Sequence, residues 1–178
     1  DMKHYSDQAA SYFQSLGVRK GDSVMLILKR YYEFWFCIVA LHKLGAVVIP
    51  ATNQLMAKDI VYRCNVAKVK LIACASEEQI LDHVDAAIEK CETVEHRVIA
   101  GKMRREGWES LDEGMATAAP FVRPTGEAAT KNTDIMLAYF TSGTTGMPKL
   151  VEHNFLYPLG HIHTAVHWHQ VQENKLHL

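Results

Sequence analysis

Apolar residues along the chain alternate between helical and strand-like spacings. Apolar positions three or four residues apart predict amphipathic helices over residues 4–16, 32–44, 59–67, 77–91 and 154–169, and a short helix over 108–115. Short apolar runs bounded by glycine, proline or charged residues predict buried strands over 23–28, 46–49, 69–74, 94–100 and 135–141. Residues 117–133, with two prolines and a glycine, form a loop.

The order of these segments predicts the fold class. Strands separated by helices of this length pair in parallel through right-handed crossovers. We therefore expect an α/β fold, with a mostly parallel sheet and helices on both faces. The first helix should bury Tyr5, Ala9, Tyr12, Phe13 and Leu16. The aromatic stripe Tyr31, Tyr32, Phe34, Trp35 and Phe36 is interpreted as packing rather than as a cofactor site.

The strand over 135–141 runs directly into a loop of small hydroxyl and glycine residues. The sequence there is Tyr139-Phe140-Thr141-Ser142-Gly143-Thr144-Thr145-Gly146-Met147-Pro148-Lys149. Four hydroxyls, two glycines and one lysine follow each other within nine residues. Glycine lets the backbone approach an anion closely, and successive N–H groups form an anion-binding concavity. This segment therefore predicts a phosphate-binding loop.

The loop does not follow the Walker A pattern, G-x-x-x-x-G-K-[ST]. Counted from Gly143, the second required glycine falls on Pro148. Lys149 takes the lysine position, but Leu150 follows where serine or threonine is needed. An ordinary P-loop nucleotide hydrolase is thereby disfavoured.

The same loop resembles the signature of the AMP-forming adenylating enzymes, which include the acyl-CoA synthetases, firefly luciferase and the adenylation domains of peptide synthetases. Their pattern, [YF]-T-S-G-[TS]-T-G-x-P-K, matches Phe140 to Lys149 without a gap, and Val151 and His153 follow in place. The runs G-V-R-K-G-D-S-V-M-L and K-L-G-A-V-V-I-P resemble the opening of these enzymes. Within the family the chain looks most similar to the acetyl-CoA and medium-chain acyl-CoA synthetases.

The resemblance implies a two-step acid–thiol ligase. A carboxylic acid, such as a fatty acid, would attack ATP to give an acyl-adenylate and pyrophosphate, and coenzyme A would then accept the acyl group. It implies ATP, magnesium and coenzyme A as cofactors and co-substrates. The implied phosphate cradle comprises Thr141, Ser142, Gly143, Thr144, Thr145, Gly146 and Lys149, with Lys149 also stabilising the charge that develops on the phosphates. For His153 we favour packing beneath the loop over a direct role in it.

Two alternatives remain open for the function. A related adenylating enzyme could pass the acyl group to a carrier-protein thiol, and a non-catalytic nucleotide-binding domain could retain the loop. The carboxylic acid and the oligomeric state are not indicated by the sequence.

The resemblance also implies that this is an incomplete N-terminal domain. We expect an α/β substructure over 1–133, the strand and phosphate loop over 134–153, and a truncated helical segment over 154–178. The downstream adenine, ribose and magnesium elements and the small C-terminal domain are missing from this sequence. The chain alone is not expected to complete the reaction.

Charge and composition argue against a nucleic-acid-binding protein and against a membrane-spanning one. The formal net charge of −1 gives no bulk attraction to nucleic acid, and the basic cluster Lys102, Arg104 and Arg105 is interpreted as a solvated turn. The longest apolar run, eight residues over 34–41, is too short for a membrane span.

Four cysteines, Cys37, Cys64, Cys74 and Cys91, lie in apolar contexts without a C-x-x-C pair. They favour a reducing, intracellular setting, and we expect a cytoplasmic protein. His163 and His167 are four residues apart and would share a helix face that could bind a metal. Because the sequence places no third ligand beside them, we interpret the histidines as a surface stripe.

Overall fold

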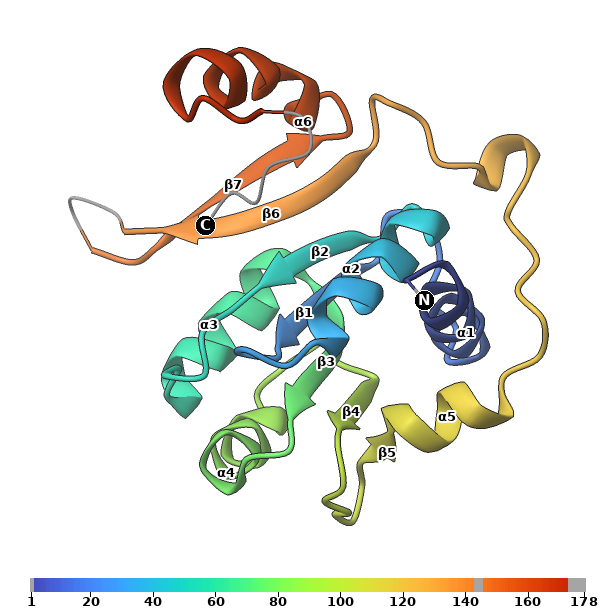
Figure 1. Cartoon of the computed structure of the whole chain (residues 1–178). Helices are drawn as coiled ribbons and strands as arrows, with labels where there is room; N and C mark the ends of the chain where they lie inside the picture. Colours follow the sequence, from blue (N-terminus) through green and yellow to red (C-terminus); the bar gives the residue numbers. More distant parts are fainter. Residues whose placement is uncertain (1, 143–145, 173–178) are drawn as a thin grey trace.

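The computed structural model describes residues 2–142 and 146–172. Within these residues a seven-stranded sheet has the order β5-β4-β3-β1-β2-β6-β7 (Figure 1). The strands are β1 Ser23–Ile27, β2 Val47–Pro50, β3 Val69–Ala75, β4 His96–Ala100, β5 Glu109–Ser110, β6 Ile135–Thr141 and β7 Lys149–Asn154. Neighbouring strands pair in parallel except β6 and β7, which pair antiparallel. The expected mostly parallel α/β fold is confirmed.

Helices cover both faces of the sheet, as predicted. They are α1 Met2–Ser15, α2 Glu33–Leu44, α3 Ala57–Ala67, α4 Glu78–Ile88, α5 Leu111–Thr117 and α6 Tyr157–Gly160, with a 3₁₀ turn over Gly126–Ala128 and a π-helical turn over Thr164–Trp168. One buried cluster joins α1, α2 and α5 to the sheet, and a second joins α3 and α4 to the opposite face. Two hydrophobic layers therefore hold the sheet between them.

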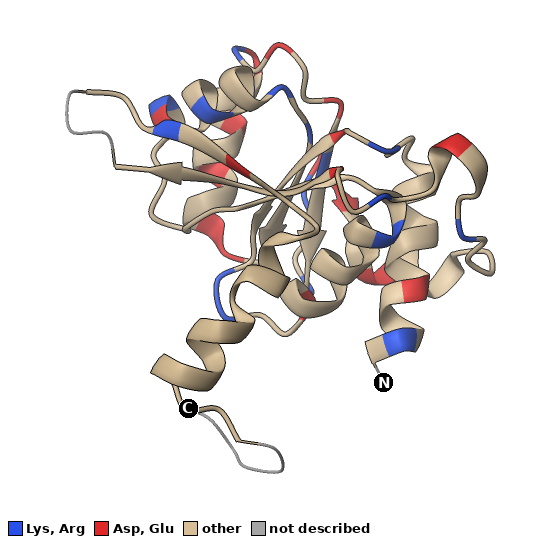
Figure 2. Ribbon diagram, turned by 90° about the horizontal axis from the view of Figure 1, so that it is seen from above, with Lys and Arg blue, Asp and Glu red and all other residues tan. Residues whose placement is uncertain are grey.

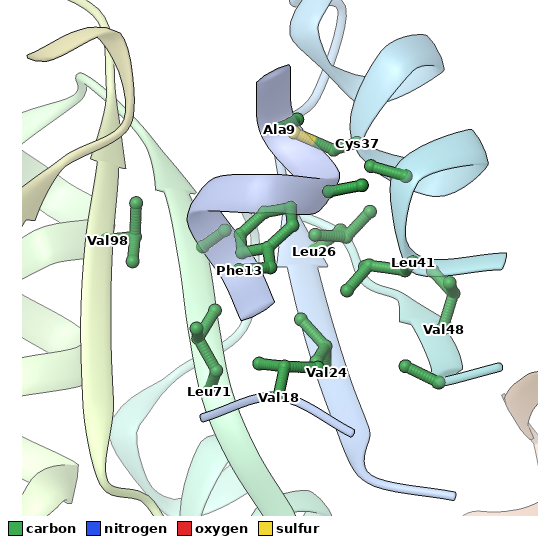
Figure 3. Close-up of a cluster of buried hydrophobic side chains, with 14 of the residues drawn as sticks. Ala9, Phe13, Val18, Val24, Leu26, Cys37, Leu41, Val48, Leu71 and Val98 are labelled. Carbon is green, nitrogen blue, oxygen red and sulfur yellow. The ribbon is translucent and has the colours of Figure 1, made fainter. Parts of the chain in front are cut away.

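The layer beneath α1 and α2 follows from the helical periodicity. Phe13 of α1 lies among Leu26 of β1 and Leu71 of β3, and Leu41 of α2 lies near Val48 of β2 (Figure 3). All five side chains are at most 1% exposed. α2 ends at Gly45, whose φ of 70° is a left-handed conformation that glycine adopts without steric cost.

Part of the aromatic stripe departs from the packing expected for it. Phe36 is buried, and Tyr31 and Phe34 are partly buried against the core, whereas Tyr32 and Trp35 are 71% and 61% exposed. α2 begins only at Glu33, and a helix packed on a sheet buries one side, so consecutive aromatic residues cannot all face inward. Tyr5 is likewise 46% exposed at the edge of the buried face of α1.

The largest departure from the sequence expectation lies after the loop. Residues 149–154 form β7, which the apolar pattern did not predict, and the helix expected over 154–169 is two short segments, α6 and the π-helical turn. Asn154 ends the strand, because its side-chain oxygen accepts a hydrogen bond from the Leu156 backbone N–H at 3.0 Å. The short helix expected over 108–115 is displaced in the same way: residues 109–110 pair with β4, and α5 begins at Leu111.

Charged residues of both signs are interspersed over the molecule (Figure 2). In the basic cluster, Arg104 forms an ion pair with Glu113 at 2.7 Å, and Arg105 pairs with Asp82 and Asp85 at 2.6 and 2.7 Å. These arginines are thus engaged with neighbouring helices rather than gathered into a basic patch.

Candidate functional site

The predicted phosphate loop connects the two strands of an antiparallel hairpin. β6 and β7 pair from Ile135 opposite Asn154 to Thr141 opposite Lys149, so Thr141 and Lys149 are the final pair before the loop. The Thr141 hydroxyl donates to the Lys149 carbonyl oxygen at 3.4 Å. Gly143, Thr144 and Thr145 lie outside the described residues. The described cradle residues are Thr141, Ser142, Gly146 and Lys149, all exposed to solvent.

The alternation of side chains along the hairpin separates its two faces. Phe140 and Leu150 are paired, and both pack against the cluster of α3 and α4. Thr141 and Lys149, one residue on, point to the opposite face, because side chains in a strand alternate. The Lys149 ammonium is therefore free of the hydrophobic layer and directed to solvent beside Thr141.

Gly146 has a φ of +132°, which disfavours any side chain even though an added Cβ would meet no atom within 4 Å. The backbone conformation, rather than crowding, accounts for glycine at this position.

The loop lies at the carboxyl edge of the parallel strands. β6 is parallel to β2, so Thr141 and the ends of β1, β2 and β3 are at the same edge of the sheet. Open α/β sheets bind ligands outside this edge. A polar cluster follows the neighbouring strands there: Asn53 donates to the Glu77 carboxylate at 3.3 Å, and Lys29 pairs with that carboxylate at 3.2 Å.

This polar cluster was not predicted from the sequence, although the positions of its residues after the strands could have indicated it. Lys29, Asn53 and Glu77 each follow closely after a predicted strand, and parallel strands bring their carboxyl ends together.

Two residues of α3 contact the base of the loop and were also missed. The Tyr62 hydroxyl donates to the Pro148 carbonyl oxygen at 2.8 Å, and the Arg63 guanidinium lies 5.3 Å from the centre of the Phe140 ring. Tyr62 and Pro148 are 86 residues apart, so no local pattern could have paired them.

His153 lies on β7 beyond the loop and packs among aromatic rings. Its ring centre is 3.9 Å from that of Tyr157 and 6.0 Å from that of Tyr139. Burial raises the pKa of Tyr139. His153 therefore packs as we favoured, but it is paired with Leu137, several residues from the loop, and does not lie beneath the loop.

The histidines that follow do not gather into a metal centre in the described part of the chain. His163 and His167 do share a face, with ring centres 6.0 Å apart and 13° between their planes. Among residues 2–142 and 146–172 no group of three histidine, cysteine or acidic side chains could hold a metal ion. All four cysteines are free and buried. None of the helices described is long and apolar enough to cross a membrane.

The sequence model of the AMP-binding enzymes matches residues 1–175 of the chain. The chain is 38% identical over 155 residues to the mitochondrial acyl-coenzyme A synthetase ACSM5 of Rattus norvegicus, covering 86% of this chain and 26% of that protein. It is 39% identical over 140 residues to the mitochondrial acyl-coenzyme A synthetase ACSM3 of Mus musculus, covering 79% and 23%. The chain thus spans about a quarter of the length of these curated relatives.

Solved structures share the fold. An anthranilate CoA ligase, AuaEII, in complex with anthranoyl-AMP superposes with a TM-score of 0.81 at 24% identity, over 99% of this chain and 32% of that one. The N-terminal domain of FACL13 from Mycobacterium tuberculosis gives a TM-score of 0.71 at 26% identity, over 86% and 36%.

These comparisons correct one expectation and establish the family. The relatives are named mitochondrial, so the expectation of a cytoplasmic protein is wrong. It rested on four cysteines in apolar contexts without a C-x-x-C pair, and reduced thiols do not distinguish one intracellular compartment from another. The match over residues 1–175 and the identity to the curated synthetases show that the chain belongs to the AMP-binding enzyme family.

Proposed function

We propose that this chain supplies the phosphate-binding part of an AMP-forming acyl-CoA synthetase. A carboxylate oxygen of the acid attacks the α-phosphorus of ATP, and the bond to the leaving pyrophosphate breaks, giving the acyl-adenylate. The coenzyme A thiol then attacks the acyl carbon, loses its proton, and releases AMP. The single observation that carries the proposal is the uninterrupted signature loop at the carboxyl edge of the sheet, in a chain matched throughout by the family.

The roles of the loop residues follow from their chemistry. Thr141 and Ser142 offer hydroxyl and backbone N–H donors, and the Lys149 ammonium adds a positive charge on the solvent-facing side of the hairpin. Gly143, Thr144, Thr145 and Gly146 complete the proposed cradle through their N–H groups and hydroxyls. Donors fixed where negative charge develops stabilise the transition state of phosphoryl transfer.

Magnesium enters the proposal only together with ATP, whose phosphate charge it would neutralise. The described residues include no set of three metal-ligating side chains. We therefore assign the ion to none of the described residues.

Coenzyme A is favoured over a carrier-protein thiol as the acyl acceptor. The curated relatives are named acyl-coenzyme A synthetases, and a solved structure with this fold is a CoA ligase. The acid is proposed only as a carboxylic acid, because the relatives' names specify no acid more closely than an acyl group.

The test is carboxylate-dependent exchange of labelled pyrophosphate into ATP by the full-length protein that carries this chain. A panel from acetate to octanoate and benzoate would be tried with magnesium present. Exchange that requires one acid supports adenylation and identifies the substrate class. Absence of exchange with every acid from folded protein would contradict the proposal.

A substitution of Lys149 tests the loop itself. Lys149→Ala should slow adenylation about tenfold or more, because a cation that stabilises transition-state charge is lost. Lys102→Ala, at an exposed turn distant in sequence from the loop, is the matched control and should retain the wild-type rate. An unchanged exchange rate in Lys149→Ala would remove Lys149 from the mechanism.

A further inference from the structure

The hairpin that carries the loop is held on one side by α3. The Tyr62 hydroxyl donates a 2.8 Å hydrogen bond to the carbonyl oxygen of Pro148. Its ring meets the Phe140 ring edge to face, with centres 6.2 Å apart and planes at 61°. One side chain thus contacts β6 and the last loop residue before β7.

The neighbouring Arg63 adds a second contact between α3 and β6. Its guanidinium lies 5.3 Å from the centre of the Phe140 ring, within the range of a cation–π interaction. On its other side it donates to the Asp59 carbonyl oxygen at 3.3 Å and lies 3.9 Å from the Asp59 carboxylate. The side chain is only 16% exposed, so solvent screens these contacts weakly.

The two contacts fall at opposite ends of the loop. Phe140 directly precedes Thr141, and Pro148 directly precedes Lys149. The paired strands β6 and β7 form the stem of the hairpin. Any rotation of this stem would move Thr141 and Lys149 together relative to the sheet edge.

α3 provides a fixed reference for the stem. Ile60, Cys64 and Ala67 are buried in the core between α3, α4 and the sheet. The Asn65 side chain donates to the Lys90 carbonyl oxygen at 2.9 Å and accepts from the Glu92 N–H at 3.0 Å. The helix is thus attached to its surroundings by contacts that do not involve the hairpin.

We propose that Tyr62 and Arg63 are positioning residues for the phosphate loop. They fix the stem so that Thr141, Ser142 and Lys149 keep one placement at the carboxyl edge of the sheet. The inference rests on the proposed function, because it assigns these two residues a part in adenylation. They touch the stem and act through it, not on the nucleotide.

Tyr62→Phe in the full-length protein tests the role, because it removes the hydroxyl and retains the ring on Phe140. Pyrophosphate exchange should fall about fivefold, the usual effect of one lost hydrogen bond, with a higher KM for ATP and an unchanged KM for the acid. Thioester formation from a synthetic acyl-adenylate and coenzyme A should stay at the wild-type rate, because that step involves no pyrophosphate. Arg63→Gln should likewise slow pyrophosphate exchange and leave thioester formation at the wild-type rate.

The control is Tyr5→Phe on α1, which removes a tyrosine hydroxyl at the exposed edge of the other hydrophobic layer and should leave both half-reactions unchanged. A loss of both half-reactions together with the melting temperature in Tyr62→Phe would indicate a structural role only. Equal exchange rates in Tyr62→Phe and wild type would also overturn the proposal.

Amide hydrogen exchange separates this inference from the proposed function. If the wild-type protein adenylates no acid, the proposed function fails, but the anchoring of the stem is still measurable. Tyr62→Phe should speed amide exchange in β6 and β7 and leave β3 unchanged. Unaltered exchange in β6 and β7 would show that the Tyr62 hydroxyl does not hold the hairpin.

Discussion

At the scale of single residues, burial and hydrogen bonding give the four cysteines different chemistry. Cys37 and Cys74 are fully buried, and burial raises the pKa of both thiols. Cys64 and Cys91 interact with each other: the hydrogen bond between them raises the pKa of the Cys64 thiol and lowers that of Cys91. The Cys91 S–H itself donates to the Ala87 carbonyl oxygen at 3.4 Å.

Alkylation should therefore proceed in a fixed order. Because the thiolate is the reactive form, Cys91 should react first with iodoacetamide in the native protein, ahead of Cys37, Cys64 and Cys74, whose pKa values are raised. Mass spectrometry of peptides from a time course at pH 8 would measure the order. Protein in urea, where all four thiols are exposed, is the control, and native labelling of Cys37 or Cys74 ahead of Cys91 would contradict the prediction.

At the scale of elements, close packing between helices depends on a glycine that the apolar pattern did not single out. Gly114 of α5 lies against the ring of Tyr12 on α1, and a Cβ at position 114 would overlap that ring. Tyr12 is 7% exposed and belongs to the core cluster beneath α1. The contact sets how closely α5 approaches α1.

Gly114→Ala should destabilise the protein despite the better helix propensity of alanine. The propensity gain is about 1 kcal/mol, whereas forcing a methyl group into a packed core costs about 1–3 kcal/mol. The expected result is a melting temperature lower by a few degrees, measured by circular dichroism. Gly160→Ala in α6 is the control, because its Cβ would meet no atom within 4 Å. If both variants melt at the same temperature, Tyr12 can move aside and the packing argument fails.

At the scale of the whole molecule, the long connection from α5 to β6 runs past α1 and α2 before it reaches the hairpin (Figure 1). Lys20 holds the C-terminal end of this connection. Its ammonium donates to the Ala129 carbonyl oxygen at 2.9 Å and pairs with Asp134 at 2.8 Å. Thr130 adds a hydrogen bond to the His42 carbonyl oxygen at 3.1 Å. These contacts place the start of β6 beside β2.

This attachment should weaken in acid. The hydrogen bond from Lys20 lowers the pKa of Asp134 below 3.8, so its contribution to stability is complete above that value and is lost as the pH falls through the folded-state pKa. Asp134→Asn should lower the urea midpoint at pH 7, and its difference from wild type should shrink at pH 3. Glu127→Gln, an exposed carboxylate in the same connection, is the control. A difference that persists undiminished at pH 3 would contradict the role of the ionised carboxylate.

Much of the fold and the central part of the candidate site could be predicted from the sequence alone. Periodicity located the helices α1 to α4 and the strands β1 to β4 and β6, each within a few residues, because a local pattern of burial specifies each element. The residues of the loop predicted a phosphate-binding segment, and their resemblance to a family signature indicated the family. The periodicity and the loop motif both depend only on residues that are close together along the chain.

Contacts between distant segments were decided only by the tertiary structure. Lys149–Asn154 is a strand because β6 pairs with it, and Tyr62 reaches Pro148 because β2 places α3 beside the hairpin. Trp35 is exposed and Phe36 buried although both are large aromatic residues on one helix. The sequence by itself determined most of the helices and strands and predicted a phosphate-binding loop. The tertiary structure decided how the loop is held, because strand pairing and packing depend on partners that lie far away along the chain.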